Sequence, residues 1–457
     1  MLFFKKKKFT TTQMITGGFL IAILIGGCVL TLPIASKNGE FTPFIDALFT
    51  ATTSICVTGL TTVVTAEHWS FFGQVVILAL IQFGGFGVVT FTTTILLILR
   101  KRITLMDRLL IQDAYNLDTL RGLVKLTIKI MQGTLIVEGI GAIFYCFQFI
   151  PEFGVIKGIW YSIFHGISAF CNAGIDLIGP TSFVPYQTNP LININTMVLI
   201  ILGGIGYPVW WDIIKKSRLA VKEQFSMKKY IKKLDLHTKI ALTVTGMLIL
   251  FGAAFIFLNE YNNELTIGKL SLGNKVMASF FQSVTLRTAG YFTIPQESLR
   301  NGSAFIGVIF MFIGGSPSGT AGGIKTVTIA VLILAALSSI KGKQDVEIYH
   351  RKIIDGYIKK ALAVFLFSFT TLMVSTICLS VVENRDFIDI LYEVASALGT
   401  VGLSRDVTLS LSPIGKIIII ITMYLGRIGP ISLALALNVS KDKSKGLRLP
   451  EEKILVG

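Results

Sequence analysis

The chain has 457 residues, of which 52% are hydrophobic and 15% are charged, and its mean hydropathy is +0.71. Too few polar residues remain to cover a soluble globule of this length, so the composition predicts an integral membrane protein. A net charge of +16 would suit a nucleic-acid-binding protein. The basic residues, however, gather in the segments that join the units of a fourfold repeat, described below. We therefore expect no nucleic acid as a partner.

Eight apolar runs follow one another along the chain, and most suit a membrane span of about 20 residues. They predict an all-α integral membrane fold with eight transmembrane helices. The runs are Met14–Leu32, Phe71–Leu99, Leu126–Ile150, Met197–Ile214, Ile240–Leu258, Phe305–Leu337, Ala361–Val382 and Ile414–Leu437.

The distribution of charge predicts the orientation of these helices. If the N-terminus lies inside, most of the 42 Lys and Arg residues fall in inner segments, and the outer segments carry more acidic than basic residues. This asymmetry predicts that both termini are cytoplasmic. A mildly negative outer face would attract cations weakly. The basic inner segments are 5–8, 100–129, 215–239, 341–360 and the C-terminal tail.

A sixteen-residue pattern that ends on glycine occurs four times at nearly even intervals. The copies are Phe44–Gly59 (FIDALFTATTSICVTG), Ile159–Gly174 (IWYSIFHGISAFCNAG), Lys275–Gly290 (KVMASFFQSVTLRTAG) and Phe387–Gly402 (FIDILYEVASALGTVG). Such repeats predict four pseudo-symmetric units around one ion pore. We place the units at 1–100 with pore loop 43–60, at 101–218 with pore loop 158–175, at 219–340 with pore loop 274–291, and at 341–457 with pore loop 387–403 and a cytoplasmic tail.

Each unit is predicted to be a helix, a re-entrant pore loop and a second helix, because the pattern is too short to cross a membrane. Re-entrant backbone is tolerated at membrane depth only where it lines a water-filled or ion-filled path. Glycine can take a positive φ and so let consecutive carbonyls face the axis. Small residues also serve close helix packing, which is the alternative for any single glycine.

Four such loops would offer rings of carbonyl oxygens to a dehydrated monovalent cation, with the negative ends of the short helices aimed at it. Ion binding is accordingly predicted for the main chain of Val57, Thr58, Gly59, Asn172, Ala173, Gly174, Thr288, Ala289, Gly290, Thr400, Val401 and Gly402. We expect no metal other than the transported ion at this filter.

The four loops, the helix–loop–helix repeat and the chain length together resemble the Trk/Ktr/HKT superfamily of potassium transporters, in particular the Ktr membrane subunit (KtrB or KtrD). The third loop, LRTAGYFT from Leu286 to Thr293, is the most specific part of the resemblance. In that superfamily glycine in all four loops goes with potassium selectivity and serine in the first loop with sodium. Gly59 therefore implies a potassium-selective pore. The resemblance also implies a homodimer and a cytoplasmic ring of nucleotide-binding subunits, KtrA or KtrC, in a bacterial plasma membrane.

The run 303–340 is almost twice as long as a straight crossing needs, and glycines and Pro317 interrupt its centre. They predict a loop at mid-membrane depth below the filter. The resemblance gives this loop a gating role; the alternative is a loop that only joins two half-helices. The predicted gate residues are Gly314, Gly315, Ser316, Pro317, Ser318, Gly319, Thr320, Ala321, Gly322, Gly323, Lys325 and Arg427.

Arg427 is the gate residue that lies outside this loop, in the last apolar run. A charge at a helix centre costs about 2.5 to 3.5 kcal/mol on insertion scales, so it needs a compensating environment. Facing the axis, its guanidinium would hydrogen-bond loop carbonyls and place positive charge in the cation path. The alternative is an arginine that extends to the cytoplasmic interface.

The remaining motifs indicate no enzyme and no cofactor. The four histidines lie in separate segments, the five cysteines include no CxxC pair, and no P-loop or GxGxxG motif offers energy coupling or nucleotide binding. The predicted function is gated, channel-like potassium uptake, with possible sodium dependence. A sodium-conducting or poorly selective relative remains an alternative, and an intramembrane enzyme such as a lipid-modifying transferase is a third.

Overall fold

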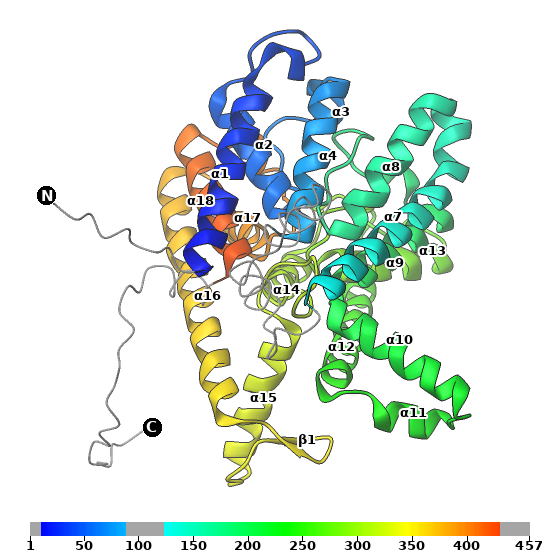
Figure 1. Cartoon of the computed structure of the whole chain (residues 1–457). Coiled ribbons are helices and arrows are strands. Elements are labelled where there is room, and N and C mark those ends of the chain that lie inside the picture. The colour runs from blue at the N-terminus through cyan, green and yellow to red at the C-terminus, as the bar shows by residue number, and fades with distance from the viewer. Residues whose placement is uncertain (1–10, 88–122, 430–457) are drawn as a thin grey trace, which may run out of the picture.

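The computed structural model describes residues 11–87 and 123–429. Within these ranges helices make up nearly all of the regular structure, and one short hairpin joins α15 to α16 (Figure 1). In chain order the helices and strands are α1 (Thr11–Thr31), α2 (Phe44–Cys56), α3 (Thr65–His68), α4 (Phe71–Phe86), α7 (Leu123–Phe153), α8 (Val155–Cys171), α9 (Pro190–Gly204), α10 (Tyr207–Lys222), α11 (Met227–Lys233), α12 (Leu236–Glu260), α13 (Leu272–Thr285), α14 (Asn301–Phe312), α15 (Thr326–Ile340), β1 (Glu347–Ile348), β2 (Arg351–Lys352), α16 (Asp355–Val382), α17 (Phe387–Gly399) and α18 (Pro413–Ile428).

One order of helices occurs four times. A long helix (α1, α7, α12 or α16) is followed by a short helix that packs back against it (α2, α8, α13 or α17). The long helices have 21 to 31 residues and the short ones 13 to 17. At 1.5 Å per residue, the long helices reach across a bilayer and the shortest do not. A third helix (α4, α9, α14 or α18) completes each group.

The four groups close into a ring through one recurring contact. The third helix of each group packs against the short helix of the next, α4 on α8, α9 on α13 and α14 on α17, and α18 packs on α2. The last group thus returns to the first. This closure brings the C-terminal ends of all four short helices together.

The outward faces of the long helices are apolar. Ile25 of α1, Ile143 of α7, Leu250 of α12 and Ile377 of α16 are each at least 60% exposed. Large aliphatic side chains on the outside of every long helix are expected where lipid, rather than water, surrounds the protein.

Among the described residues, α1, α7, α12 and α16 are long and apolar enough to cross a membrane, and α9 with α10 adds a fifth span if the bent pair counts as one. The run Met197–Ile214, expected as one crossing, is instead two helices that meet at 97°. Pro208 lacks the N–H that would continue α9, and Gly206 takes a φ of 93°. The ends of two other predicted runs, 88–99 and 430–437, lie outside the described residues.

The run 303–340 is broken where the sequence predicted a loop. Helix α14 ends at Phe312 and α15 begins at Thr326, and the intervening residues form no helix. The α10–α11 pair and the β1–β2 hairpin project from one end of the molecule (Figure 1). These elements carry two of the basic segments assigned to the inner side, 215–239 and 341–360; segments 5–8, 100–122 and the tail lie outside the described residues.

Candidate ion pathway

The four glycines that end the repeated pattern lie against one another. Each faces the middle carbonyl of a neighbouring loop so closely that a Cβ would collide with it. The pairs are Gly59 with Ala173 O (2.5 Å from the Cβ position), Gly174 with Ala289 O (2.5 Å), Gly290 with Val401 O (2.7 Å) and Gly402 with Thr58 O. These contacts run from the first loop through the second, third and fourth and back to the first.

The same unusual backbone recurs in all four loops. The first residue of each predicted triplet takes a left-handed conformation: φ is 56° at Val57, 61° at Asn172, 68° at Thr288 and 51° at Thr400. The glycines that follow two residues later also have positive φ, from 62° to 101°. A left-handed conformation costs a residue with a side chain about 1 to 2 kcal/mol, so the surrounding protein must hold it in place. The sequence predicted the glycine conformations but not those of the residues that begin the triplets.

Side-chain hydroxyls inside the short helices hold these loops. Thr53 Oγ1 accepts from Gly59 N at 2.9 Å, and Ser396 Oγ accepts from Gly402 N at 3.0 Å. Ser168 donates to Ile175 O at 2.7 Å, and Thr285 donates to Tyr291 O at 2.5 Å. The sequence analysis missed these four residues. Their signal in the sequence is a hydroxyl residue at the tenth position of the first, second and fourth copies of the sixteen-residue pattern, and at the eleventh position of the third copy.

A cavity of about 390 Å³ opens above the four glycines, all of which line it. Asp176, Glu297 and Asp406 also line it, one each from the segments after the second, third and fourth triplets. The described residues that line it include no lysine or arginine. Burial raises the pKa of Asp176 to about 6, while hydrogen bonds from the backbone N–H groups of Ile178 and Gly179 act in the opposite direction. The cavity therefore offers negative charge to a cation that approaches the loops from this side.

The loop between α14 and α15 lies beneath the second pore loop. Ser316 N donates to Gly204 O at 2.8 Å, and Thr320 N donates to Gly203 O at 3.1 Å. The Thr320 hydroxyl also donates to Phe170 O, at the end of α8, at 3.1 Å. One side of this loop is thus fixed to the second unit.

Its other side reaches the fourth pore loop. A Cβ on Gly322 would lie 2.7 Å from Gly399 O and would collide with the Thr400 hydroxyl. Lys325 donates back to Ala321 O at 2.6 Å and to Gly322 O at 3.2 Å. The loop therefore runs directly below the ring of glycines, from the second unit to the fourth.

Arg427, near the end of α18, holds this loop from below. Its Nη1 donates to Thr320 O and its Nη2 to Gly84 O of α4, both at 2.5 Å. The guanidinium thus connects the fourth unit with the loop of the third unit and with the first. The guanidinium points to loop and helix carbonyls. The stretch Leu425–Gly429 (LGRIG) corresponds to Phe83–Gly87 (FGGFG) in the first unit and Leu202–Gly206 (LGGIG) in the second, where Gly85 and Gly204 stand in place of Arg427.

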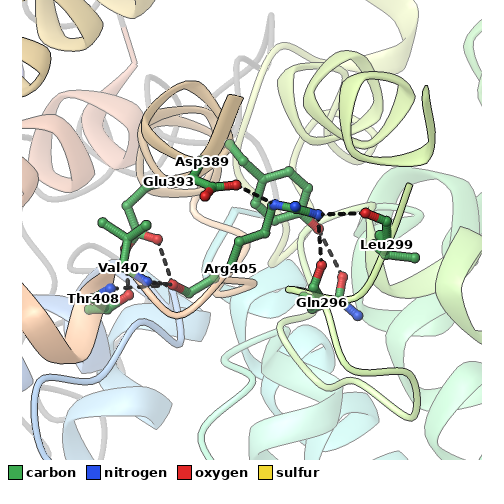
Figure 2. Close-up of polar contacts among 9 residues, drawn as sticks. Gln296, Leu299, Asp389, Glu393, Arg405, Val407 and Thr408 are labelled. Carbon is green, nitrogen blue, oxygen red and sulfur yellow. Dashed lines mark hydrogen bonds and ion pairs between the residues drawn. The ribbon is translucent and has the colours of Figure 1, made fainter. Parts of the chain in front are cut away.

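Glu393 supports the fourth pore loop from behind. It accepts from the Ser404 hydroxyl at 2.6 Å and from the Thr408 hydroxyl, and Ser404 Oγ in turn accepts from Val407 N at 3.1 Å (Figure 2). Glu393 thus connects α17 with the segment that follows the fourth triplet.

Two further charged residues have partners in neighbouring helices. Glu138 accepts from Gln82 Nε2 with both carboxylate oxygens, at 3.2 Å each. Arg287 donates to Thr245 O at 3.2 Å. In the part of the chain that the structure describes, no group of three or more His, Cys, Asp or Glu residues is placed to hold a metal.

Three side-chain oxygens of the predicted filter triplets have no protein partner among the described residues. They are Thr58 Oγ1, Asn172 Oδ1 and Thr400 Oγ1, and all three side chains are buried. Asn172 and Thr400 begin their triplets, on the side that faces the loop 314–325. A buried oxygen without a hydrogen bond costs free energy unless another group, such as a cation, occupies the adjacent space.

Comparison with known proteins matches this arrangement to one family. The family model described as TrkH, cation transport protein, matches residues 6–446. The chain is 40% identical to the potassium/sodium uptake protein NtpJ of Enterococcus hirae, with 99% of this chain and 98% of that protein covered. It is 37% identical to the Ktr system potassium uptake protein B of Bacillus subtilis, with 98% and 97% covered.

The fold has a solved counterpart as well. The crystal structure of the potassium transporter TrkH from Vibrio parahaemolyticus superposes with a TM-score of 0.73 over 96% of this chain and 87% of that one, at 16% identity. Membership of a transporter family and several long apolar helices identify a multi-pass membrane protein. Matched over nearly its whole length, the chain belongs to the TrkH family of cation transport proteins.

Proposed function

We propose that this protein takes up potassium through a channel-like, gated pore as the membrane subunit of a Ktr-type system. The observation that carries the proposal is the closed ring in which each filter glycine lies against the middle carbonyl of a neighbouring loop. Carbonyl oxygens from four loops around one axis replace the hydration shell of a monovalent cation. The triplets 57–59, 172–174, 288–290 and 400–402 are the proposed selectivity filter.

The gate we propose is the loop 314–325 together with Arg427. The loop lies between the ring and the other end of the molecule, and Arg427 places a positive charge beside it. A cation leaving the filter would meet both the loop backbone and this charge, so flux requires the loop to move.

The names of similar proteins support the wider assignment. Relatives from Bacillus subtilis and Vibrio alginolyticus are named Ktr system potassium uptake protein B, and a further one from Bacillus subtilis is protein D of that system. We propose that this chain likewise forms a homodimer in a bacterial plasma membrane, with cytoplasmic termini and a nucleotide-binding ring subunit like KtrA or KtrC. The positive charge of the basic inner segments would bind the nucleotide-binding ring subunit, and anionic lipid would compete for the same segments.

Complementation tests this proposal. A potassium-uptake-deficient bacterium that expresses this chain with a ring subunit should grow at low potassium, whereas the chain alone should support weaker growth. A matched control carries Gly59→Ala with the same ring subunit, since a Cβ there would meet Ala173 O. No rescue, despite normal amounts of the protein in the membrane, would contradict the proposal.

A second candidate function is uptake of both potassium and sodium. The name of the Enterococcus hirae relative, potassium/sodium uptake protein, favours it. Isotope uptake into vesicles decides between the two: a potassium-selective pore takes up potassium while sodium is in excess, and a mixed pore takes up both ions in parallel.

A further inference from the structure

Arg405 follows the fourth filter triplet and joins two neighbouring units on the outer side of the ring. Its Nε donates to Asp389 Oδ1 at 2.6 Å, at the start of the short helix α17. Its Nη1 donates to the backbone oxygens of Gln296 at 2.9 Å and Leu299 at 3.1 Å, both in the segment after the third filter triplet. Figure 2 shows the guanidinium between these groups.

The contact is well shielded from solvent. The Arg405 side chain is 8% exposed and that of Asp389 23% exposed. Hydrogen bonds between charged groups are roughly twice as strong as neutral ones, and the planar fork of arginine fixes direction as well as distance. Three acceptors on two units therefore determine where the guanidinium lies.

A second layer of hydrogen bonds reinforces the same junction. Tyr392 of α17 donates to Gln296 Oε1 at 2.9 Å, and Gln296 exchanges hydrogen bonds with Gln282 of α13 at 2.7 and 3.1 Å. These residues are buried. The backbone of Gln296 is thus held from below by neutral side chains and from the side by Arg405.

The other junctions between units use different contacts. Trp160 Nε1 donates to Gln74 Oε1 at 2.8 Å between the second and first units, and Phe183 N donates to Phe292 O at 3.0 Å between the second and third. Lys416 pairs with Asp46 at 2.6 Å between the fourth and first units. Arg405 differs from these contacts because its guanidinium, three residues beyond a filter glycine, reaches two backbone carbonyls of the adjacent unit.

We infer that Arg405 is a positioning residue for the selectivity filter, which fixes the spacing of the third and fourth pore loops and thereby the discrimination between potassium and sodium. The inference rests on the proposed function. A dehydrated ion is selected by the spacing and number of the carbonyls around it, and Gly290 and Gly402 lie in contact directly below this clamp. Releasing the clamp lets the two loops move apart and accept an ion of another size.

The test compares Arg405→Gln with Arg385→Gln in full-length protein. Arg385 also lies on the outer side, but it is exposed and donates to the Ser410 hydroxyl at 2.7 Å, so its replacement removes the same charge without touching the filter loops. Potassium uptake into vesicles is measured against sodium competition. In purified protein, the rise in melting temperature is measured separately with potassium and with sodium.

We expect Arg405→Gln to lower the preference for potassium over sodium in uptake by about tenfold, a change of the size found for coupled buried side chains. The difference between the melting-temperature rises with potassium and with sodium should become smaller in the same variant. Arg385→Gln should leave the preference unchanged. Arg405→Lys, which keeps the charge but not the fork, should recover part of it, and Asp389→Asn should lose less because the two carbonyl contacts remain.

A wild-type preference in Arg405→Gln would overturn the positioning role, and so would an equal loss in both arginine variants. If Arg405→Gln does not fold, Asp389→Asn serves as the test, and an unchanged preference there overturns the inference. An unaltered protein that prefers neither ion would overturn the proposed function itself, which separates that failure from a failure of Arg405 alone.

Discussion

Gly290 is the single residue at which we expect the discrimination between ions to be most easily tested. Its φ is 84°, and a Cβ would lie 2.7 Å from Val401 O and 2.8 Å from Gly174 Cα. We expect Gly290→Ser to push the third and fourth loops apart and to reduce the preference for potassium over sodium by at least about tenfold. Competitive isotope uptake measures this preference. An unchanged ratio would show that the third loop does not select the ion.

Arg427 is the second single residue that we expect to affect transport, through its proposed barrier role. Arg427→Ala removes the charge and both hydrogen bonds that hold the loop, so potassium flux through the membrane subunit without its ring should rise by roughly tenfold or more. Arg427→Lys should give an intermediate flux. Vesicle uptake of a potassium isotope measures it, with Arg218→Ala on α10 as a control that removes an exposed inner arginine. Equal flux in Arg427→Ala and the control would contradict the barrier role.

At the scale of elements, the packing of three third helices, α4, α9 and α18, on their own short helices depends on a glycine that faces a backbone carbonyl. A Cβ on Gly203 of α9 would collide with Phe170 O at the end of α8 and would lie 2.8 Å from the Thr320 hydroxyl of the gating loop. Gly203→Ala should therefore displace both a pore helix and the loop, at a cost of about 1 to 3 kcal/mol. The midpoint of thermal unfolding in detergent measures this loss.

Gly139 of α7 provides the matched control, since nothing lies within 4 Å of its Cβ position. Gly139→Ala should be neutral or stabilise the helix by up to about 1 kcal/mol. If both alanine variants unfold at the same temperature, the close approach of α9 to α8 is not a stabilising contact.

The sequence predicted the features that several residues signal together and missed those that no local pattern signals. The glycine register and the break near Pro317 were readable because four copies, or several interrupting residues, give the same signal. The clamp at Arg405 was not readable, because its carbonyl acceptors at Gln296 and Leu299 are more than 100 residues away and any residue type supplies them. The bend after α9 was missed because its apolar run continues across Gly206 and Pro208.

At the scale of the whole molecule, the proposed orientation places the cavity above the filter on the outer side, so we expect uptake to depend on external pH. Because the pKa of Asp176 is about 6, its carboxylate is charged at pH 7 and becomes neutral as the outer pH falls below 6. The KM for potassium should then rise several-fold between pH 7 and pH 5, since less negative charge faces the entering ion. Asp176→Asn should have a raised KM at pH 7 and little further change at pH 5. A pH profile identical to that of the unaltered protein would contradict this role.

Among the described residues, the ring of four groups is nearly regular at the filter and irregular below it. The second group bends by 97° after α9, the third carries the loop 314–325, and the fourth has Arg427 where the first two have glycine. In the proposed function, the filter triplets select the ion, and the loop 314–325 with Arg427 controls its release. Substitutions in the loop region can therefore change when the pore opens without changing its preference for potassium over sodium.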